Sequence, residues 1–396
     1  MSVAGLTGAP APAAPTMPDP YRLLFPIGLT WGLIGAGLWP VHALGMIAWP
    51  AIAHRMLMIQ GFEQSFVLGF LLTAIPGFTH GERCRPSELA IAVLSAVAFG
   101  AAVIAGRFAI AEGAFVISVL LLLSAVARRV ARPGLAPPLE MMFVAFGLLL
   151  GLAGGLVQLA VTLGMSEPAP RMGERLMSLG MVLSLVLGVG GLLVPVFAGM
   201  RDPLVIAGIA GPHERRGRRR FYAGLLALFA LAFVAEWVGH PRLGALLRAG
   251  AATAVGLMVW KLTRLPGRRT MPAFVLWSSG WLILAGLWVM ALLPSFTLGA
   301  LHLVFIGGFT LITLGIGTRV VVAHGKFPLT DESLALSPVV VAAVAVAVLA
   351  RLAAEWIPAR ATLLLGVSGA VWMLGWILWA MRAVPRIVKT RPAAPR

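Results

Sequence analysis

The chain has 396 residues, of which 60% are hydrophobic and only 11% are charged. Because one transmembrane helix needs about 20 mostly apolar residues, this composition excludes a soluble globular protein and predicts an all-α, polytopic membrane helical bundle. The net charge of +17 is explained by the accumulation of Lys and Arg in the cytoplasmic loops of membrane proteins. The expected partner is therefore a lipid bilayer, and no nucleic-acid partner is expected. The single cysteine, Cys84, excludes an internal disulfide and a cysteine-based metal centre, so redox chemistry would require a cofactor.

The chain divides into two short tails and one long apolar region. Residues 1–20 hold five prolines and no Lys or Arg, lack the pattern of a signal peptide, and are expected to form a disordered cytoplasmic tail. A twelve-span transmembrane domain is expected over residues 21–384, followed by a basic cytoplasmic tail over residues 385–396. The apolar runs predict spans at about 22–40, 56–76, 88–106, 110–127, 139–165, 176–199, 221–238, 245–263, 272–293, 297–323, 338–357 and 361–383.

Basic residues are distributed unequally between the two sides of this arrangement. The loops after even-numbered spans, together with the two ends, hold 23 Lys and Arg, whereas the opposite side holds 8, among them Arg351. This bias predicts that both termini lie in the cytoplasm. Glycines at four-residue spacing, such as Gly147, Gly151 and Gly155, are expected to let neighbouring helices pack closely within the lipid.

Glu63, Gln64, Glu236 and Arg319 are polar residues that fall within predicted spans. An ionisable group at the centre of a span costs about 2.5–3.5 kcal/mol on insertion scales, so each one requires a reason. Glu63 and Gln64 lie about a third of the way into the second span, where a functional role competes with a structural hydrogen bond. Glu236, near the outer end of the seventh span, is open to both interpretations. Arg319, near the inner end of the tenth span, is expected to extend to the interface.

Histidines at matching depth suggest a metal site. His54 opens the second span and His302 opens the tenth, both on the outer side, and two histidines on different helices can hold one metal, as in haem-binding bundles. His324 lies on the inner side, about 33 Å from His302 along a continuous helix. These two histidines therefore cannot share a metal unless the helix between them breaks. The alternative for an isolated histidine at a span end is a hydrogen bond at the interface.

Two histidines have a methionine four residues further along the chain. His42 is followed by Met46, and His54 is followed by Met58. Each pair shares a face if its segment is helical, and an imidazole with a thioether suits copper. Methionine is also common in membrane helices, so copper is the weaker of the two metal predictions.

Three stretches of the sequence resemble the NnrS family. The main one runs from His54 through Gly61-Phe62 to Gly69-Phe70-Leu71-Leu72-Thr73-Ala74, the second covers residues 300–329, and a weaker one covers residues 190–197. The resemblance implies a bacterial inner-membrane protein with twelve spans that contains haem and copper. It also implies an association with nitric oxide metabolism and nitrosative stress.

The resemblance carries over to individual residues. The family's second span begins His-Ala-His-Glu-Met; His54 takes the place of the first His, whereas the second His falls on Met56 and the Glu on Leu57. His302, Arg319 and His324 keep their places in the late block.

These matches lead to a prediction for the cofactor. His54 and His302 are expected to bind one haem iron near the periplasmic face. Gly61, Gly307 and Gly308 are expected to leave space for a flat macrocycle beside the two helices. Glu63 lies too far along its helix to orient His54 and is expected to serve as a proton-carrying group.

Two other classes of function compete with this interpretation. One is a secondary transporter in which Glu63 and Glu236 are the coupling carboxylates, although the sequence shows no clear repeat between its halves. The other is a metal-free membrane assembly protein. An absorption spectrum of the purified protein discriminates between a haem protein and both alternatives. The sequence predicts no reaction, so whether the protein is an enzyme is left open.

Overall fold

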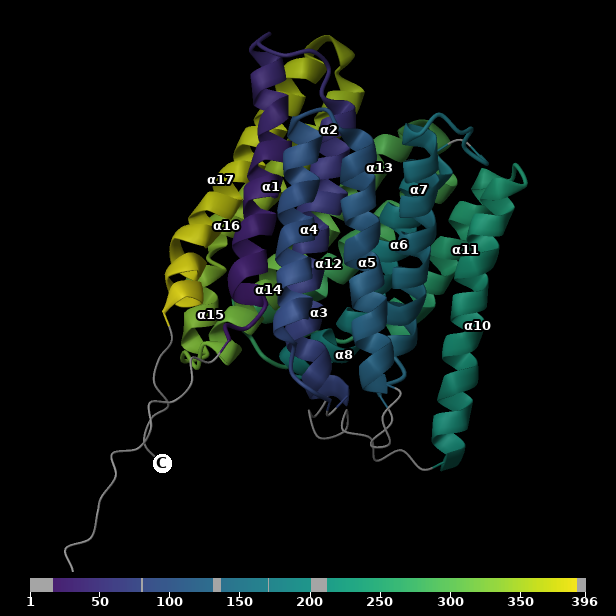
Figure 1. Cartoon of the computed structure of the whole chain (residues 1–396), viewed down its shortest axis with the longest axis vertical. Helices are drawn as coiled ribbons and strands as arrows, with labels where there is room; N and C mark the ends of the chain where they lie inside the picture. Colours follow the sequence, from purple (N-terminus) through teal and green to yellow (C-terminus); the bar gives the residue numbers. More distant parts are fainter. Residues whose placement is uncertain (1–16, 80, 131–136, 170, 201–211, 390–396) are drawn as a thin grey trace, which may run out of the picture.

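The computed structural model describes residues 17–79, 81–130, 137–169, 171–200 and 212–389. Within these ranges it contains helices and no strands, and twelve of the helices are long and apolar enough to cross a membrane. They stand side by side as one bundle (Figure 1). The predicted all-α membrane bundle of about twelve spans is therefore confirmed. Most of the predicted amino-terminal tail, up to residue 16, lies outside the described residues, as does the other predicted tail from residue 390.

The helices follow one another with short connections. The first six spans are built from α1 (Tyr21–Ala43), α2 (Ala51–Met56) with η1 (Leu57–Glu63) and α3 (Gln64–Thr79), α4 (Pro86–Ile104), α5 (Phe108–Val130), α6 (Met141–Thr162), and α7 (Met172–Arg175) with η2 (Leu176–Val182) and α8 (Leu183–Phe197). The second six are built from α10 (Pro212–Trp237), α11 (Pro241–Ala254) with η3 (Val255–Val259), α12 (Met271–Leu292), η4 (Pro294–Phe296) with α13 (Thr297–His302), η5 (Leu303–Phe309) and α14 (Thr310–His324), α16 (Pro338–Trp356), and η6 (Pro358–Arg360) with α17 (Ala361–Val388). A short helix, α15 (Thr330–Ala335), joins α14 to α16.

Some helix boundaries differ from those predicted. The second span begins at Ala51, five residues earlier than expected, so His54 lies within its first turn. The last helix continues to Val388, so the start of the predicted basic tail is helical. There the guanidinium of Arg386 bonds the Asp331 carboxylate on α15 at 2.9 Å, which ties this last turn to the bundle.

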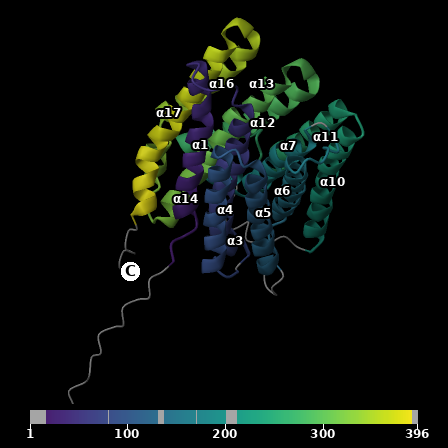
Figure 2. The ribbon, with the colours of Figure 1, turned by 45° about the horizontal axis from the view of Figure 1, so that its top comes forward.

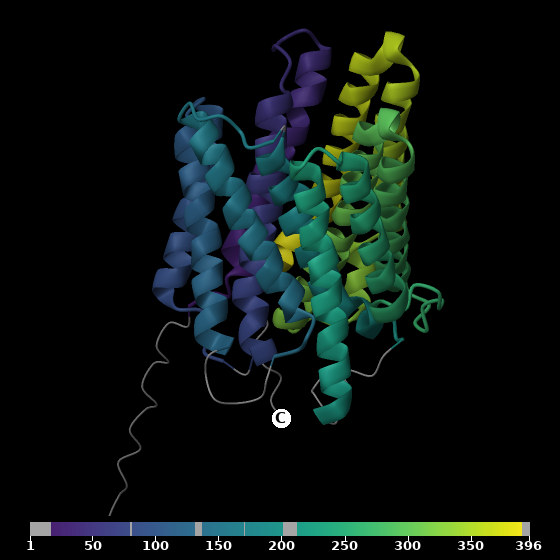
Figure 3. The same cartoon turned by 90° about the vertical axis from the view of Figure 1, so that its right-hand side faces the viewer.

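The two ends of the bundle differ in their side chains. The histidine end holds the starts of α2 and α13 and lies at the top of Figure 1; the basic end holds α15, the loop 260–270 and the end of α17. Helices α1, α16 and α17 pack together on one side, and the pair α10 and α11 lies on the opposite side (Figure 2). In Figure 3, α10 extends beyond its neighbours at the basic end.

Four spans contain a π-helical stretch: the second, sixth, eighth and tenth, at η1, η2, η3 and η5. A π-helix is rare and often marks a functional site, because the wider turn redirects the side chains around it. The stretches η1 and η5 come directly after the turns that carry His54 and His302. In both spans a π-helical stretch thus directly follows the histidine, in contrast to the regular α-helical winding of an ordinary transmembrane helix.

Glycines allow the helices to approach closely, as their spacing predicted. A Cβ added at Gly151 would lie 2.3 Å from the sulfur of Met181, and one at Gly147 would lie 3.0 Å from the carbonyl oxygen of the same residue. At Gly100 the added atom would lie 2.2 Å from the ring of Trp31. That ring also donates a hydrogen bond from Nε1 to the Ala96 carbonyl at 3.0 Å, so α1 and α4 are in contact along a glycine face.

Replacing Gly100 with alanine should therefore destabilise the bundle. The new methyl group must displace the Trp31 ring, and overpacking of a core costs about 1–3 kcal/mol. Thermal unfolding in detergent should show a lower midpoint for Gly100→Ala. Gly113→Ala is the matched control, because nothing lies within 4 Å of a Cβ at Gly113 and alanine favours a helix by about 1 kcal/mol over glycine. A midpoint for Gly100→Ala equal to that of the control would contradict this account of the contact.

The charge bias predicts which end of the bundle faces the cytoplasm. In a Cys84→Ser background, Met165→Cys at the histidine end should react with an impermeant thiol reagent in intact cells. Arg264→Cys at the basic end should react only after the cells are permeabilised. Both positions are exposed, so burial does not explain a difference between them. Labelling of Arg264→Cys in intact cells would reverse the proposed orientation.

Candidate functional site

His54 and His302 line one cavity at the histidine end, which we call the histidine cavity. Residues of α1, α2, η1, α13, η5, α14, α16 and α17 line it, and its volume is about 660 Å³ including its open part. Its walls carry the thioether of Met58 and aromatic rings from four helices, namely Trp39, Phe62, Phe305 and Trp372. Tertiary packing therefore brings together two histidines that are 248 positions apart in the sequence.

Both imidazole rings are held by backbone carbonyls. Nδ1 of His54 donates to the carbonyl oxygen of Gly35 at 2.9 Å, and Nδ1 of His302 donates to that of Leu298 at 2.8 Å. A carbonyl oxygen only accepts hydrogen bonds, so the proton of each neutral ring is on Nδ1. The lone pair of Nε2 is then left to accept a proton or to coordinate a metal.

His42 lies beside this cavity but does not line it. Its Nδ1 bonds the carbonyl oxygen of Ile47 at 3.0 Å in the loop between α1 and α2. The ring of Trp39 packs edge-on against both His42, at 6.2 Å between centroids, and His54, at 5.3 Å. Trp39 therefore contacts both His42 and His54. Of these two histidines, only His54 lines the cavity.

Arg351 is a wall residue that the sequence analysis counted only as an outer-side charge. It comes from α16, is 6% exposed, and its Nη1 bonds the Glu355 carboxylate at 3.3 Å. Among the lining residues it is the one permanently charged cation. An arginine within the apolar run 338–356 was the available signal, because a buried guanidinium is costly unless it serves a partner or a site.

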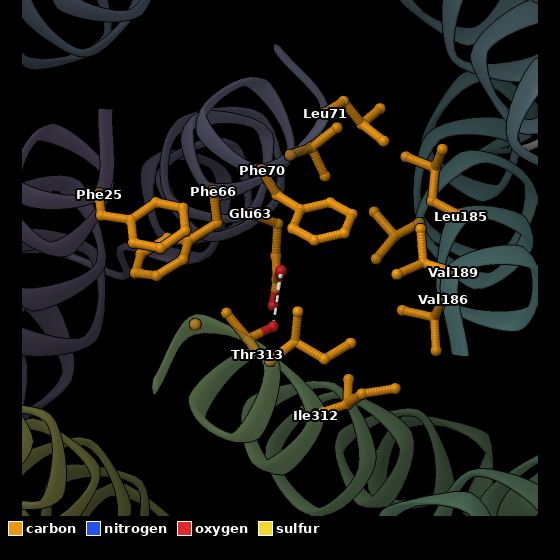
Figure 4. Close-up of a pocket in the computed structure, with 14 residues that line it drawn as sticks. Phe25, Glu63, Phe66, Phe70, Leu71, Leu185, Val186, Val189, Ile312 and Thr313 are labelled. Carbon is orange, nitrogen blue, oxygen red and sulfur yellow. Dashed lines mark hydrogen bonds between the residues drawn. The ribbon is translucent and has the colours of Figure 1, made fainter. Parts of the chain in front are cut away.

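Glu63 faces the interior of the bundle at the inner limit of the histidine cavity. Its side chain is 9% exposed and accepts a hydrogen bond from the Thr313 hydroxyl on α14 at 3.3 Å (Figure 4). The neighbouring Gln64 has a different partner, because its Nε2 donates to Ser118 on α5 at 2.8 Å. Consecutive residues of the second span are thus bound to different helices.

A further buried carboxyl group escaped the sequence analysis. Glu112 on α5 is 2% exposed and accepts a hydrogen bond from the Gln60 amide at 2.6 Å. The acidic residue within the apolar stretch 108–130 was the signal. Glu112 and Gln60 are absent from the walls of the histidine cavity, so their contact joins α5 to η1.

Glu236 and Arg319 both take part in ion pairs. Glu236 bonds Arg248, with both side chains 3% exposed, and also bonds Arg175 at 3.1 Å. Arg319 bonds Glu332 at 2.6 Å, and its guanidinium lies 4.8 Å from the ring centroid of Phe197. Neither residue lines the histidine cavity. Their contacts explain why both charges are retained in apolar helices: each one connects different helices.

His324 ends α14 at the basic end, and the span that begins before His302 continues through η5 and α14 to His324 without a break. Its ring packs 5.9 Å from that of Tyr21, and it lines a separate cavity together with Cys84. Burial, reinforced by the nearby Glu88 carboxylate, raises the pKa of the Cys84 thiol to about 12. At neutral pH this thiol is protonated and therefore a poor nucleophile and metal ligand.

The glycines expected to accommodate a macrocycle are packed against other helices, so this expectation was wrong. A Cβ at Gly61 would lie 3.1 Å from Trp31, and one at Gly308 would lie 2.3 Å from Ile283. A Cβ at Gly307 would lie 3.3 Å from Leu282. The reason is that these glycines serve helix contact on the faces of η1 and η5 that pack against α1 and α12.

The donor atoms at the histidine cavity limit the kind of metal centre. In the part of the chain that the structure describes, no group of three or more His, Cys, Asp or Glu side chains is placed to hold a metal ion. The cavity offers two imidazoles and, from Met58, one thioether. Two imidazoles match the axial positions of a haem, whose own ring supplies the other four ligands.

Comparison with known families identifies the chain. The family model described as NnrS protein matches residues 15–391. The chain belongs to the NnrS family. It is therefore a multi-pass, nitric oxide-related membrane protein, and both segments that carry the cavity histidines lie within the match. No curated protein matches the chain.

The ion pair between Glu236 and Arg248 should be structural. Removing one partner of a buried pair leaves an uncompensated charge and costs about 3–5 kcal/mol. Glu236→Gln should therefore lower the thermal unfolding midpoint strongly. Glu82→Gln, which alters the exposed pair with Arg85, should change it little, because exposed pairs contribute about 0–1 kcal/mol. Equal midpoints for the two variants would refute this role of Glu236.

Proposed function

We propose that this NnrS protein binds haem in the bacterial inner membrane and acts in nitric oxide metabolism or the response to nitrosative stress. His54 and His302 are the residues that would hold the haem iron. The observation that carries the proposal is that both residues line one cavity from different helices, each with its Nδ1 proton held by a backbone carbonyl.

The residues of the cavity suit a haem. Its aromatic walls match the apolar faces of a flat macrocycle, and Arg351 is a cation suited to the carboxylate groups at the macrocycle's edge. A bound haem would supply an iron that changes its oxidation state, and a small gas could bind that iron in place of one of the two histidines.

The protein's own contribution is to orient the ligands. The carbonyls of Gly35 and Leu298 fix the tautomer of each imidazole, as backbone carbonyls and carboxylates commonly do for metal-bound histidines. Trp372 is fixed in the wall because its Nε1 donates to the Thr310 hydroxyl at 3.0 Å. Rings held in this way exclude water from the site.

Met58 is the specific reason to keep copper as a second candidate. Its thioether lines the same cavity as the two imidazoles, and imidazole with thioether is a donor set that copper accepts. The transporter hypothesis has less support, because Glu236 is already bound by Arg175 and Arg248. A metal-free assembly protein would contain neither haem nor copper.

Purified wild-type protein should contain haem, with a Soret band that shifts on reduction by dithionite. His54→Ala and His302→Ala should each lose most of the haem at unchanged expression, because each removes one axial ligand. His240→Ala is the control, since His240 is exposed and does not line the cavity. Metal analysis of the same samples reports copper.

Two outcomes would overturn the proposal. If the wild-type protein contains no haem, the proposed cofactor is wrong. If both histidine variants keep their full haem content, His54 and His302 are not ligands of the haem. Copper without haem in the wild type, lost in Met58→Leu, would favour the second candidate.

A further inference from the structure

A second cavity lies deeper in the bundle, which we call the apolar cavity. Residues of α1, α3, α8 and α14 form its walls, and its volume is about 570 Å³ including its open part. In Figure 4, Leu185, Val186 and Val189 of α8 face Glu63 and Thr313 across this space. Glu63, Val186 and Thr313 all lie well inside their spans, so the cavity is at the depth of the hydrocarbon core.

The chemistry of its walls is almost uniform. Apart from Glu63 and Thr313, the walls are aliphatic and aromatic side chains and one glycine, Gly317. The two polar residues are bonded to each other at 3.3 Å. A water molecule in a cavity needs two to four polar partners, and apolar cavities stay dry and take up apolar guests such as xenon.

Glu63 is shared by the two cavities. Its side chain lines both the apolar cavity and the histidine cavity, and it is held to α14 by one hydrogen bond from Thr313. Glu63 is the described lining residue that the two cavities have in common, so a passage between them would run beside its side chain. Ions and polar solutes would still be excluded by the apolar walls.

We propose that the apolar cavity binds a small uncharged gas, of the class to which nitric oxide belongs, and delivers it past Glu63 to the histidine cavity. Such a molecule dissolves in the hydrocarbon core and reaches the cavity from within the membrane. The binding step is argued from the apolar cavity and does not depend on the presence of haem. The delivery step rests on the proposed function, because it ends at the haem.

Xenon tests the binding step without any need for haem. Xenon NMR of the purified protein in detergent should show saturable binding to the wild type. Val186→Phe fills the cavity and should abolish that binding, and Val186→Ile should weaken it. Val346→Phe is the control, because Val346 is 47% exposed on α16 and lines neither cavity. Wild-type protein without saturable binding, or binding that persists in Val186→Phe, would overturn the site.

Carbon monoxide tests the delivery step. After flash photolysis of the reduced haem complex, the bimolecular rebinding rate should fall about tenfold in Val186→Phe relative to Val346→Phe at equal haem content. An unchanged rate in Val186→Phe that has lost xenon binding would overturn delivery. Absence of haem in the wild type would refute the proposed function and delivery together, and xenon would still decide whether the site exists.

Discussion

A hydrocarbon environment offers no water to complete a hydrogen bond or to solvate a charge, and this constraint governs the bundle. Its polar side chains are therefore bound to one another across helices. Trp379 donates to the Thr318 hydroxyl at 2.8 Å, and Gln60 donates to Glu112 at 2.6 Å. Such contacts fix the relative rotation of neighbouring spans, which apolar packing alone would leave weakly specified.

Close packing complements these polar contacts. Where glycine removes a side chain, a large residue of the next helix fills the space, as Trp31 does at Gly100 and Trp260 does at Gly190, where an added Cβ would lie 2.1 Å from the ring. The histidine cavity lies beside two π-helical stretches, since η1 and η5 both supply its walls. The proposed ligand site is therefore bordered by locally irregular winding in otherwise closely packed helices.

Glu63 lines both the histidine cavity and the apolar cavity. On one side are imidazoles and a guanidinium at the histidine end, and on the other are aliphatic walls within the core of the bundle. A haem bound by the first and a gas bound by the second would meet at this carboxyl group. The proposed cofactor site and the proposed gas site thus have different linings, one with polar groups and one almost entirely apolar.

The sequence by itself determined the fold class, the twelve spans and the family, because apolar run length and the His54 and His302 blocks are local features of the chain. It also determined the depth of each polar residue along its span. Only the tertiary structure decided which way each residue faces. The sequence analysis thus assigned Gly61 and Gly308 to a cofactor, although they face helices, and it overlooked Arg351, which faces the cavity. The depth of a residue in the membrane follows from its position along its helix. The direction in which its side chain points follows from the rotation of that helix about its axis, and contacts between distant spans fix this rotation.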